Sequence, residues 1–176
     1  MTLTRFVAVL LWVVGMVTGC TLGSGTPANS NVPPIIQTPT DGEQGTVVRV
    51  VDGDTIRVMI NGREEPVRYI GINTPERDEV CYQEATDANR ALVEGRTVRL
   101  VKDRSDRDRY DRLLRYVYIG DVFVNALLVQ DGWAEVVRYE PDTREFDNFR
   151  NLEIAAANLG RGCHPTGIFN DETYTR

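Results

Sequence analysis

The segment RYIGINTPE at residues 68–76 is the part of the sequence from which the rest of the chain can be interpreted. Two other short segments belong with it, DGDT at 52–55 and RYDR at 109–112. Together they offer carboxylates, an amide, a backbone carbonyl restrained by a proline, and arginines. Oxygen ligands without neighbouring histidine or cysteine suit a hard cation such as Ca²⁺, and guanidinium groups suit phosphate oxygens. These residue types therefore point to phosphodiester chemistry.

Composition leaves room for one domain of ordinary size with extensions at its ends. The chain has 176 residues, 41% of them hydrophobic, which is enough to bury one core. Its net charge is -6, whereas proteins that bind polyanions by counterion release are usually basic, so any contact with nucleic acid must be local. The single histidine, His164, stands in a Gly-Cys-His-Pro turn and is expected at the surface, which argues against histidine-based catalysis.

The first 43 residues differ in character from the rest. Residues 1–19 carry Arg5 and an apolar run that ends in small residues before Cys20, which is the pattern of a bacterial lipoprotein signal peptide. A plain signal peptide cleaved nearby, or an uncleaved anchor, is the alternative. A lipid on Cys20 would hold an exported chain on the membrane surface of the cell envelope. Residues 20–43 are rich in Ser, Thr, Pro, Gly and Asn and predict a flexible linker.

From Gly45 onward the pattern changes to short β-type runs. The predicted strands cover residues 46–51, 55–60, 66–72, 97–101 and 113–119, with a strand-like run at 133–137. The predicted helices cover residues 79–95, 124–130 and 142–159. Asn61-Gly62 between two β-type runs is a strong hairpin signal. This order predicts an α+β, mainly β fold over residues 44–170, a five-stranded oligonucleotide-binding (OB) barrel with three helices, followed by a tail at 171–176.

Four separated motifs occur in register between residues 44 and 169. They are DGDT at 52–55, RxxGxNTPE at 68–76, DRYDR at 108–112 and FVNALLVQDG at 123–132. In this combination the chain resembles the staphylococcal-type thermonucleases. The resemblance implies a Ca²⁺-dependent nuclease that hydrolyses phosphodiester bonds in DNA and RNA and leaves 3′-phosphate ends. A monomer is expected.

The resemblance also implies a set of Ca²⁺ ligands. These are Asp54, Asn73 and Thr74, the last through its backbone carbonyl. Asn73 departs from the best-known member of the family, which has Asp there, and the lost negative charge is expected to weaken binding or alter metal choice. Without the resemblance, Asp-Gly-Asp is an ordinary turn and Thr74-Pro75-Glu76 is a helix-start signal.

Three residues are implied as catalytic. Glu76 matches the general base that positions or deprotonates the attacking water. Arg68 and Arg112 match the two arginines that bind phosphate and neutralise charge in the transition state. Each arginine taken alone is more simply a solvated charge.

The surroundings of Arg112 hold further candidates. Asp111 precedes it where the family usually has glycine, and the Asp111 carboxylate is expected to pair with a neighbouring arginine and compete with phosphate. Tyr110 and Tyr139 match positions that line the nucleotide pocket. The basic residues between 96 and 115 either form a phosphate-attracting rim or pair with the interleaved aspartates in a solvated loop.

The cysteines lack the close spacing of a zinc site. Cys81 follows the segment 68–76, and Cys163 follows the last predicted helix. In an exported protein these two can form a disulfide, while a reducing compartment would leave two buried thiols.

Two other functions fit the same sequence. The first is a non-catalytic OB barrel that holds nucleic acid or a partner protein at the cell surface. The second is a Ca²⁺-stabilised structural domain of the envelope. Turnover distinguishes a nuclease from both, because fold alone does not give activity.

Overall fold

The computed structural model describes residues 41–170. The predicted signal peptide over 1–19, the lipidation site Cys20, all but the last residues of the predicted linker over 20–43 and the tail over 171–176 lie outside the described residues. Within 41–170, no helix combines the length and the apolar character needed to cross a membrane.

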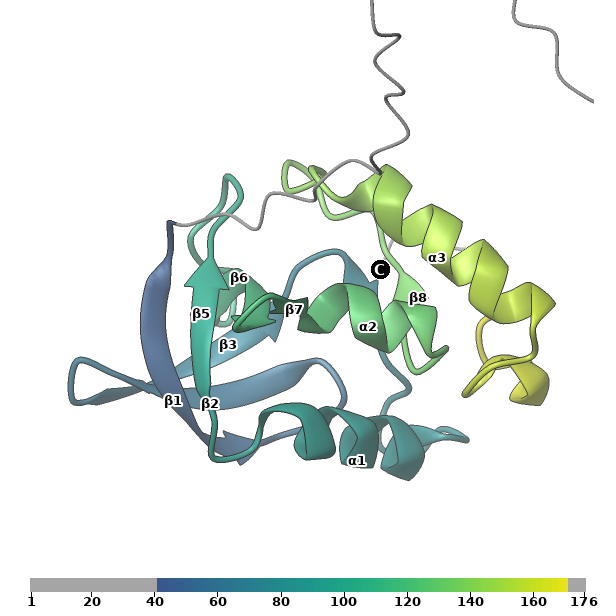
Figure 1. The fold of residues 1–176 in the computed structure, drawn as a ribbon, viewed down its shortest axis with the longest axis horizontal. Coiled ribbons are helices and arrows are strands. Elements are labelled where there is room, and N and C mark those ends of the chain that lie inside the picture. Colours follow the sequence, from purple (N-terminus) through teal and green to yellow (C-terminus); the bar gives the residue numbers. More distant parts are fainter. Residues whose placement is uncertain (1–40, 171–176) are drawn as a thin grey trace, which may run out of the picture. The chain divides into compact units, whose positions relative to one another are not determined.

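Five strands close into a barrel (Figure 1). They are β1 (Glu43–Val50), β2 (Thr55–Ile60), β3 (Arg63–Tyr69), β5 (Thr97–Val101) and β6 (Leu113–Ile119). β1 pairs antiparallel with β2 and β5, and β6 pairs antiparallel with β5. A parallel pairing of β3 with β6, from Val67 opposite Leu113 to Tyr69 opposite Arg115, closes the ring. The predicted fold class, a mainly β OB barrel with three helices, is confirmed.

The turn between β2 and β3 lies at the predicted place. Asn61 and Gly62 have φ angles of 49° and 81°, and the ladder resumes with Ile60 opposite Arg63. A tight hairpin that needs positive φ at both central residues selects Asn-Gly. The inward faces of the strands carry fully buried residues such as Ile56 and Val58, which fill the barrel.

The predicted strand over 66–72 was wrong as a single element. β3 ends at Tyr69, and the next two-residue strand, β4 (Ile72–Asn73), pairs with β8 (Glu135–Val136) in a separate sheet. Gly71 lies at the break with φ of 77°, and a Cβ there would stand 3.1 Å from the Phe149 ring. Glycine is therefore required at the bend, which carries residues 72–76 away from the barrel ladder.

The helices agree with prediction in type and differ in length. α1 (Tyr82–Val93) and α3 (Phe146–Asn158) are shorter than the predicted spans, and α2 (Val124–Gln130) matches its span. β7 (Val122–Phe123) precedes α2 as a short addition to β6. In Figure 1, α2 lies between the barrel and α3. Phe149 of α3 is fully buried, whereas Leu159, at the end of the predicted span over 142–159, lies beyond the helix end and is 66% exposed.

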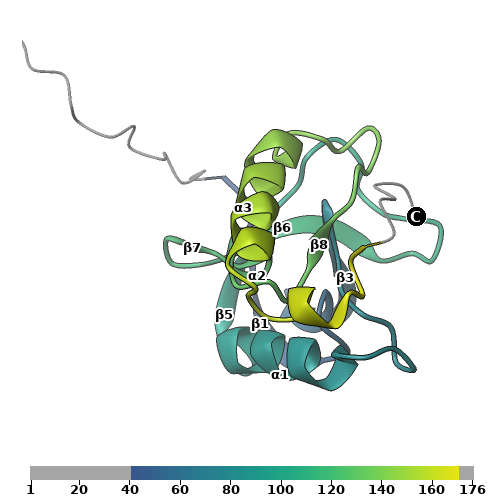
Figure 2. The ribbon, with the colours of Figure 1, turned by 90° about the vertical axis from the view of Figure 1, so that its right-hand side faces the viewer.

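A disulfide joins Cys81 to Cys163 across 82 residues of sequence. Figure 2 shows the segment after α3, which contains the short 3₁₀ helix η1 (His164–Thr166), running back toward α1. The bridge therefore ties the segment that follows Glu76 to the C-terminal end of the described chain. The surface position expected for His164 was wrong, because the ring is half-buried against Phe169 with centroids 5.3 Å apart, and burial lowers the pKa of His164.

Candidate active site

A pocket of about 590 Å³ gathers most of the predicted site residues. Those that line it are Asp54, Arg68, Asn73, Glu76, Tyr110, Arg112 and Tyr139. They come from the turn before β2, the ends of β3 and β4, the segment after β4, the loop before β6 and the segment after β8. The remaining predicted residue, Thr74, reaches the same place through its contacts with Asp54.

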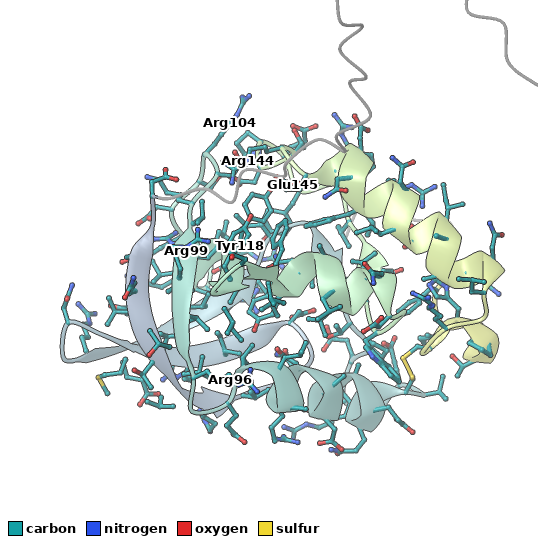
Figure 3. All side chains as sticks on the ribbon, viewed as in Figure 1. Arg96, Arg99, Arg104, Tyr118, Arg144 and Glu145 are labelled. Atoms are coloured by element: carbon teal, nitrogen blue, oxygen red, sulfur yellow. A yellow bond between two sulfur atoms is a disulfide. The ribbon has the colours of Figure 1, made fainter. Side chains whose placement is uncertain are left out.

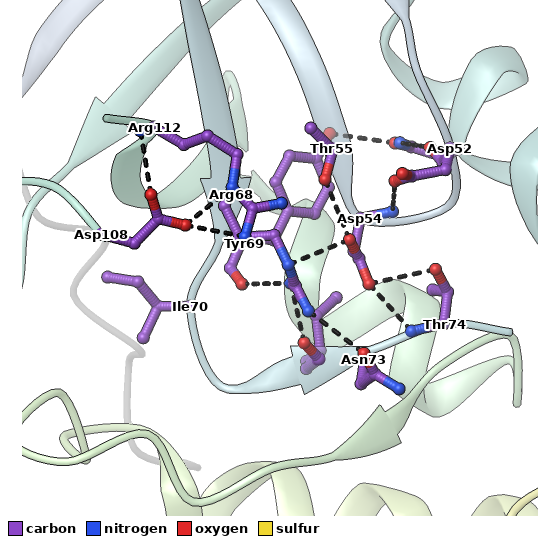
Figure 4. Close-up of polar contacts among 12 residues, drawn as sticks. Asp52, Asp54, Thr55, Arg68, Tyr69, Ile70, Asn73, Thr74, Asp108 and Arg112 are labelled. Atoms are coloured by element: carbon purple, nitrogen blue, oxygen red, sulfur yellow. Dashed lines mark hydrogen bonds and ion pairs between the residues drawn. The ribbon is translucent and has the colours of Figure 1, made fainter. Parts of the chain in front are cut away.

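Asp54, in the motif at 52–55, connects that motif to Thr74 in the motif at 68–76 (Figure 4). Its Oδ2 accepts hydrogen bonds from the Thr74 backbone N–H at 2.8 Å and from Thr74 Oγ1 at 3.0 Å. Its Oδ1 accepts from Thr55 Oγ1 and lies 3.1 Å from Arg68 Nε. A Cβ on Gly53 would stand 2.6 Å from Thr74 Oγ1, so the glycine lets the two segments meet. The role of the Thr74 carbonyl as a metal ligand stays a prediction.

Arg68 is buried near the end of β3, just before the bend, and is not a solvated charge. Its Nη1 donates to the carbonyl oxygens of Tyr69 at 2.7 Å and Ile72 at 2.8 Å. Its Nη2 donates to Asn73 Oδ1 at 3.3 Å. Together with the Nε contact to Asp54, these bonds engage four of the five N–H groups of a guanidinium within the described chain. Arg68 therefore holds the bend to Asp54, and one N–H of Nη2 is left for a ligand.

Arg112 is held by Asp108, which was not among the predicted site residues. Asp108 Oδ2 lies 2.7 Å from both Nε and Nη2 of Arg112, in a fork-shaped ion pair (Figure 4). The Asp108 side chain is 4% exposed and its Oδ1 also accepts from the backbone N–H groups of Tyr110 and Arg112. Burial raises the pKa of Asp108, but these hydrogen bonds outweigh it and leave the pKa below its usual value. The only signal for this pair was the spacing of four within DRYDR.

Asp111 pairs with a neighbouring arginine, as expected. It adopts φ of 63°, in the left-handed region that favours glycine. Its carboxylate lies 3.5 Å from Arg107 Nε and is 82% exposed, while its carbonyl oxygen accepts from Arg107 at 2.7 Å. Asp111 therefore pairs with a neighbouring arginine, as expected, but that arginine is Arg107 and not Arg112.

The basic run between 96 and 115 does not form one rim. Arg107 pairs with Glu65, and Arg115 pairs with Glu43 and Asp106, so that of these three partners only Asp106 is an interleaved aspartate. Figure 3 shows Arg99 beside Tyr118, over whose ring its guanidinium lies at 4.4 Å, and Arg99 does not line the pocket.

The pocket itself holds Arg109, whose guanidinium lies 4.7 Å from the centre of the Tyr110 ring. Arg112 lies 5.4 Å from the same ring, and Tyr110 is 63% exposed. An exposed ring flanked by cations is suited to stacking on a base beside a bound phosphate. Tyr139 is half-buried and lines the same pocket from the segment after β8.

Glu76 lies exposed at the pocket. Its backbone N–H donates to Glu79 Oε2 at 2.7 Å, within a turn that precedes α1. Since α1 begins only at Tyr82, the alternative that Thr74-Pro75-Glu76 starts this helix was wrong. The Glu76 carboxylate is thus available to solvent and to a substrate in the pocket.

The residues around Asp54 fit a hard cation. Asp52, which the sequence analysis treated only as part of a turn, lines the pocket beside Asp54. Its pKa rises to about 6, because the group is buried and because the Asp54 charge lies close to it. Among residues 41–170 no three acidic, histidine or cysteine side chains form a metal-binding group, so amide and carbonyl oxygens would have to complete the shell. An all-oxygen set with adjacent carboxylates suits Ca²⁺.

Glu135 is a second residue that sequence reasoning missed. It belongs to β8, is 4% exposed, and its Oε1 accepts a hydrogen bond from Asn73 Nδ2 at 2.9 Å. In the sequence it was one residue of a strand-like run, and nothing there linked it to Asn73, which lies 62 positions earlier.

Comparisons with known proteins agree with this geometry. The profile of the family described as "Staphylococcal nuclease homologue" matches residues 66–163. That range includes Arg68, Asn73, Glu76 and Arg112, whereas Asp54 precedes it.

Three relatives extend the match. The endonuclease YncB of Bacillus subtilis (strain 168) is 37% identical over 135 residues, which are 72% of this chain and 61% of the relative. The SPbeta prophage-derived endonuclease YokF of the same strain is 41% identical over 119 residues, 63% of this chain and 40% of the relative. The thermonuclease of Staphylococcus hyicus is 33% identical over 119 residues, 64% of this chain and 70% of the relative. The chain thus spans less than two thirds of both Bacillus endonucleases. It belongs to the staphylococcal nuclease homologue family.

Proposed function

We propose that this chain is a Ca²⁺-dependent nuclease that hydrolyses phosphodiester bonds in DNA and RNA and leaves 3′-phosphate ends. The observation that carries the proposal is that the Asp52 and Asp54 carboxylates, the exposed Glu76 and the two arginines Arg68 and Arg112 are among the residues that line one pocket. The names of the relatives, two endonucleases and a thermonuclease, support the same activity.

Asp54, Asn73 and Thr74 would hold the Ca²⁺, with the Asp52 carboxylate beside them. When bound, the ion would supply positive charge that acidifies a water molecule and offsets negative charge on the phosphate. The hydrogen bonds from Thr74 to Asp54 fix the relative positions of the two segments that carry these ligands. A preformed arrangement of this kind reduces the reorganisation needed for catalysis.

Glu76 accepts the proton of the attacking water. As the water oxygen bonds to phosphorus, the bond from phosphorus to the 5′ oxygen breaks, and the leaving alkoxide takes a proton from solvent. The phosphate therefore stays on the 3′ side. A carboxylate that is exposed at the pocket can exchange its proton with bulk water and return to the basic form after each turnover.

The arginines bind the phosphate from two sides. Arg112 presents its planar fork at the pocket and exchanges part of its contact with Asp108 for phosphate oxygens. Arg68 offers its remaining Nη2 N–H from the β3–β4 bend. Charge that grows on the equatorial oxygens in the transition state is stabilised by donors that are already in place.

Export and lipid attachment form part of the proposal. The pattern of residues 1–20 supports a lipid on Cys20, and the Cys81–Cys163 disulfide supports an oxidising compartment. The enzyme then acts as a monomer on the cell envelope. Growth with a radiolabelled fatty acid tests the anchor: the full chain takes up label, Cys20→Ala does not, and equal labelling of both would reject it.

The activity is tested by incubating the full chain with single-stranded DNA or RNA at millimolar Ca²⁺ or with chelator. Cleavage depends on Ca²⁺, the products carry 3′-phosphates by mass spectrometry, and Glu76→Gln lowers the rate by about 10² to 10⁴. Cleavage that persists in chelator, or that Glu76→Gln leaves unchanged, contradicts the proposal.

A non-catalytic nucleic-acid-binding module is the second candidate. One observation favours it: both arginines already have internal partners, Arg68 at the bend and Arg112 on Asp108. Such a module binds single-stranded nucleic acid without turnover. A Ca²⁺-stabilised structural domain differs again, because Ca²⁺ raises its melting temperature but it has no affinity for nucleic acid.

A further inference from the structure

We propose that Glu135 is a positioning residue that orients the Asn73 amide, so that its oxygen and not its NH₂ group faces the cation site. The inference rests on the Ca²⁺ site of the proposed function. It explains how an asparagine can stand where the family's best-known member has an aspartate, and it assigns the missing negative charge to a residue of another strand.

The pairing of β4 with β8 brings the two residues together. Asn73 stands directly opposite Glu135 in this antiparallel ladder, and both side chains are buried, at 7% and 4% exposure. Asn73 Nδ2 donates to Glu135 Oε1 at 2.9 Å. On its other side, Asn73 Oδ1 accepts from Arg68 Nη2 at 3.3 Å, next to the Arg68–Asp54 pair (Figure 4).

With Glu135 and Arg68 as neighbours, the Asn73 amide keeps both of its hydrogen bonds in one orientation only. An ionised carboxylate only accepts hydrogen bonds, and a guanidinium only donates them. If the Asn73 amide turned over, its oxygen would face the Glu135 carboxylate and its NH₂ group would face Arg68. Both charge-assisted hydrogen bonds would be lost in a buried place, where unpaired polar groups are strongly disfavoured. Glu135 and Arg68 therefore direct Oδ1 toward Asp54, where a cation ligand is needed.

The same contact explains why residue 73 is an amide. An aspartate there would put a second carboxylate at hydrogen-bond distance from Glu135, without a proton between them. Two buried carboxylates in contact repel each other, because both charges have lost solvation and lie close together. With Glu135 in place, the amide is the compatible residue. The negative charge that Asn73 lacks lies one side chain farther from the site, on Glu135.

A plain charge effect is the alternative explanation, and a double-mutant cycle separates the two. If Glu135 acts through the Asn73 amide, Glu135→Gln weakens Ca²⁺ binding only while Asn73 is present. If Glu135 acts through its negative charge alone, Glu135→Gln weakens Ca²⁺ binding equally in the Asn73→Ala background. Glu140→Gln is the matched control, because Glu140 also lines the pocket, is exposed and pairs with Arg138 instead of Asn73.

The experiment measures the Ca²⁺ dissociation constant of the full chain by calorimetry for the wild type, Glu135→Gln, Asn73→Ala, the double variant and Glu140→Gln. Loss of a residue that orients a ligand typically weakens metal binding by about 10- to 100-fold, so Glu135→Gln and Asn73→Ala should each do so. The double variant should match Asn73→Ala within about two-fold, and Glu140→Gln should match the wild type. Equal weakening in both backgrounds, or none, overturns the positioning role.

A second readout does not depend on the ion. In chelator, Asn73→Asp should lower the melting temperature by several degrees, and adding Glu135→Gln should restore it. A further fall on adding Glu135→Gln would overturn the proposed contact even if that variant alone folds poorly. A wild type that binds no Ca²⁺ at millimolar concentration overturns the cation site itself, and the positioning role with it. The melting temperatures in chelator then still report on the Asn73–Glu135 contact. Failure of the Ca²⁺ site can therefore be distinguished from failure of the contact.

Discussion

The β3–β4 bend and the loop over residues 106–112 both bring arginines to the pocket, but Arg68 and Arg112 are held in different ways. Arg68 at the bend is buried and bonded to backbone carbonyls and to Asp54. Arg112 in the loop is 28% exposed and is held by the single carboxylate of Asp108. The bend therefore couples its arginine to the barrel itself, whereas the loop can release its arginine to a phosphate without disturbing the fold.

The largest expected effect comes from breaking the bend. Arg68→Ala removes the hydrogen bonds to two carbonyls and leaves Asp54 buried without its cationic partner. Truncating one partner of a buried ion pair costs about 3–5 kcal/mol of unfolding free energy. Denaturant unfolding measures this loss. Arg112→Ala is the matched control from the loop, and it should lose only about 1–3 kcal/mol, because Asp108 keeps its hydrogen bonds from two backbone N–H groups. Similar losses in both variants would contradict the distinction.

Removing the disulfide tests whether the segment beyond the bend depends on its tie to the C-terminal end. A bridge across 82 residues restricts the unfolded chain, and its loss typically costs about 2–4 kcal/mol. The double variant Cys81→Ala/Cys163→Ala should therefore melt at a lower temperature than the wild type. Wild-type protein after reduction serves as the control. An unchanged melting temperature would show that packing alone fixes this segment.

Replacing Asp108 with asparagine should loosen the loop and leave the bend intact. The variant loses a charge-assisted fork, which should lower the unfolding free energy by about 1–3 kcal/mol at neutral pH. Its KM for nucleic acid should also change. The folded-state pKa of Asp108 is lowered, so its stabilisation is present above the ordinary pKa near 4 and is lost as pH falls through the lower folded value. Unfolding free energies between pH 7 and pH 2 should thus converge for the two proteins. A constant difference over this range would contradict the ionic origin.

The smallest effect is expected at Asp111. Its φ of 63° strains a residue with a Cβ, and its exposed carboxylate contributes little through Arg107. Asp111→Gly should raise the unfolding free energy by about 0.5–1 kcal/mol and leave the cleavage rate unchanged. Asp111→Ala, which keeps the strain, should not stabilise. A marked change in rate would mean that Asp111 does act on Arg112.

The sequence predicted those features whose cause is local. Asn61-Gly62 determines its hairpin from two residues, and the order of strands and helices predicted the barrel. The break at Gly71 could not be predicted, because the apolar run around it has the pattern of one continuous strand. What ends that strand is the pairing of Ile72 with Val136, far along the chain.

The site residues also fall into two groups, those that local sequence marks and those that depend on contacts between distant segments. The motif residues were predicted because family motifs mark them, and all but Thr74 line one pocket. Asp108 was missed because its neighbours in the loop offered equally plausible pairs, and only the backbone turn at Asp111 decides among them. Glu135 was missed because its partner, Asn73, is brought near only by the pairing of β4 with β8.

The most direct test is single-turnover cleavage of a short single-stranded DNA by the full chain at saturating Ca²⁺, with Arg112→Ala beside the wild type. The account predicts cleavage by the wild type to 3′-phosphate products, and a rate about 10² to 10³ lower for a folded Arg112→Ala with unchanged Ca²⁺ affinity. No cleavage by a folded wild type, or equal rates for the two proteins, would contradict it.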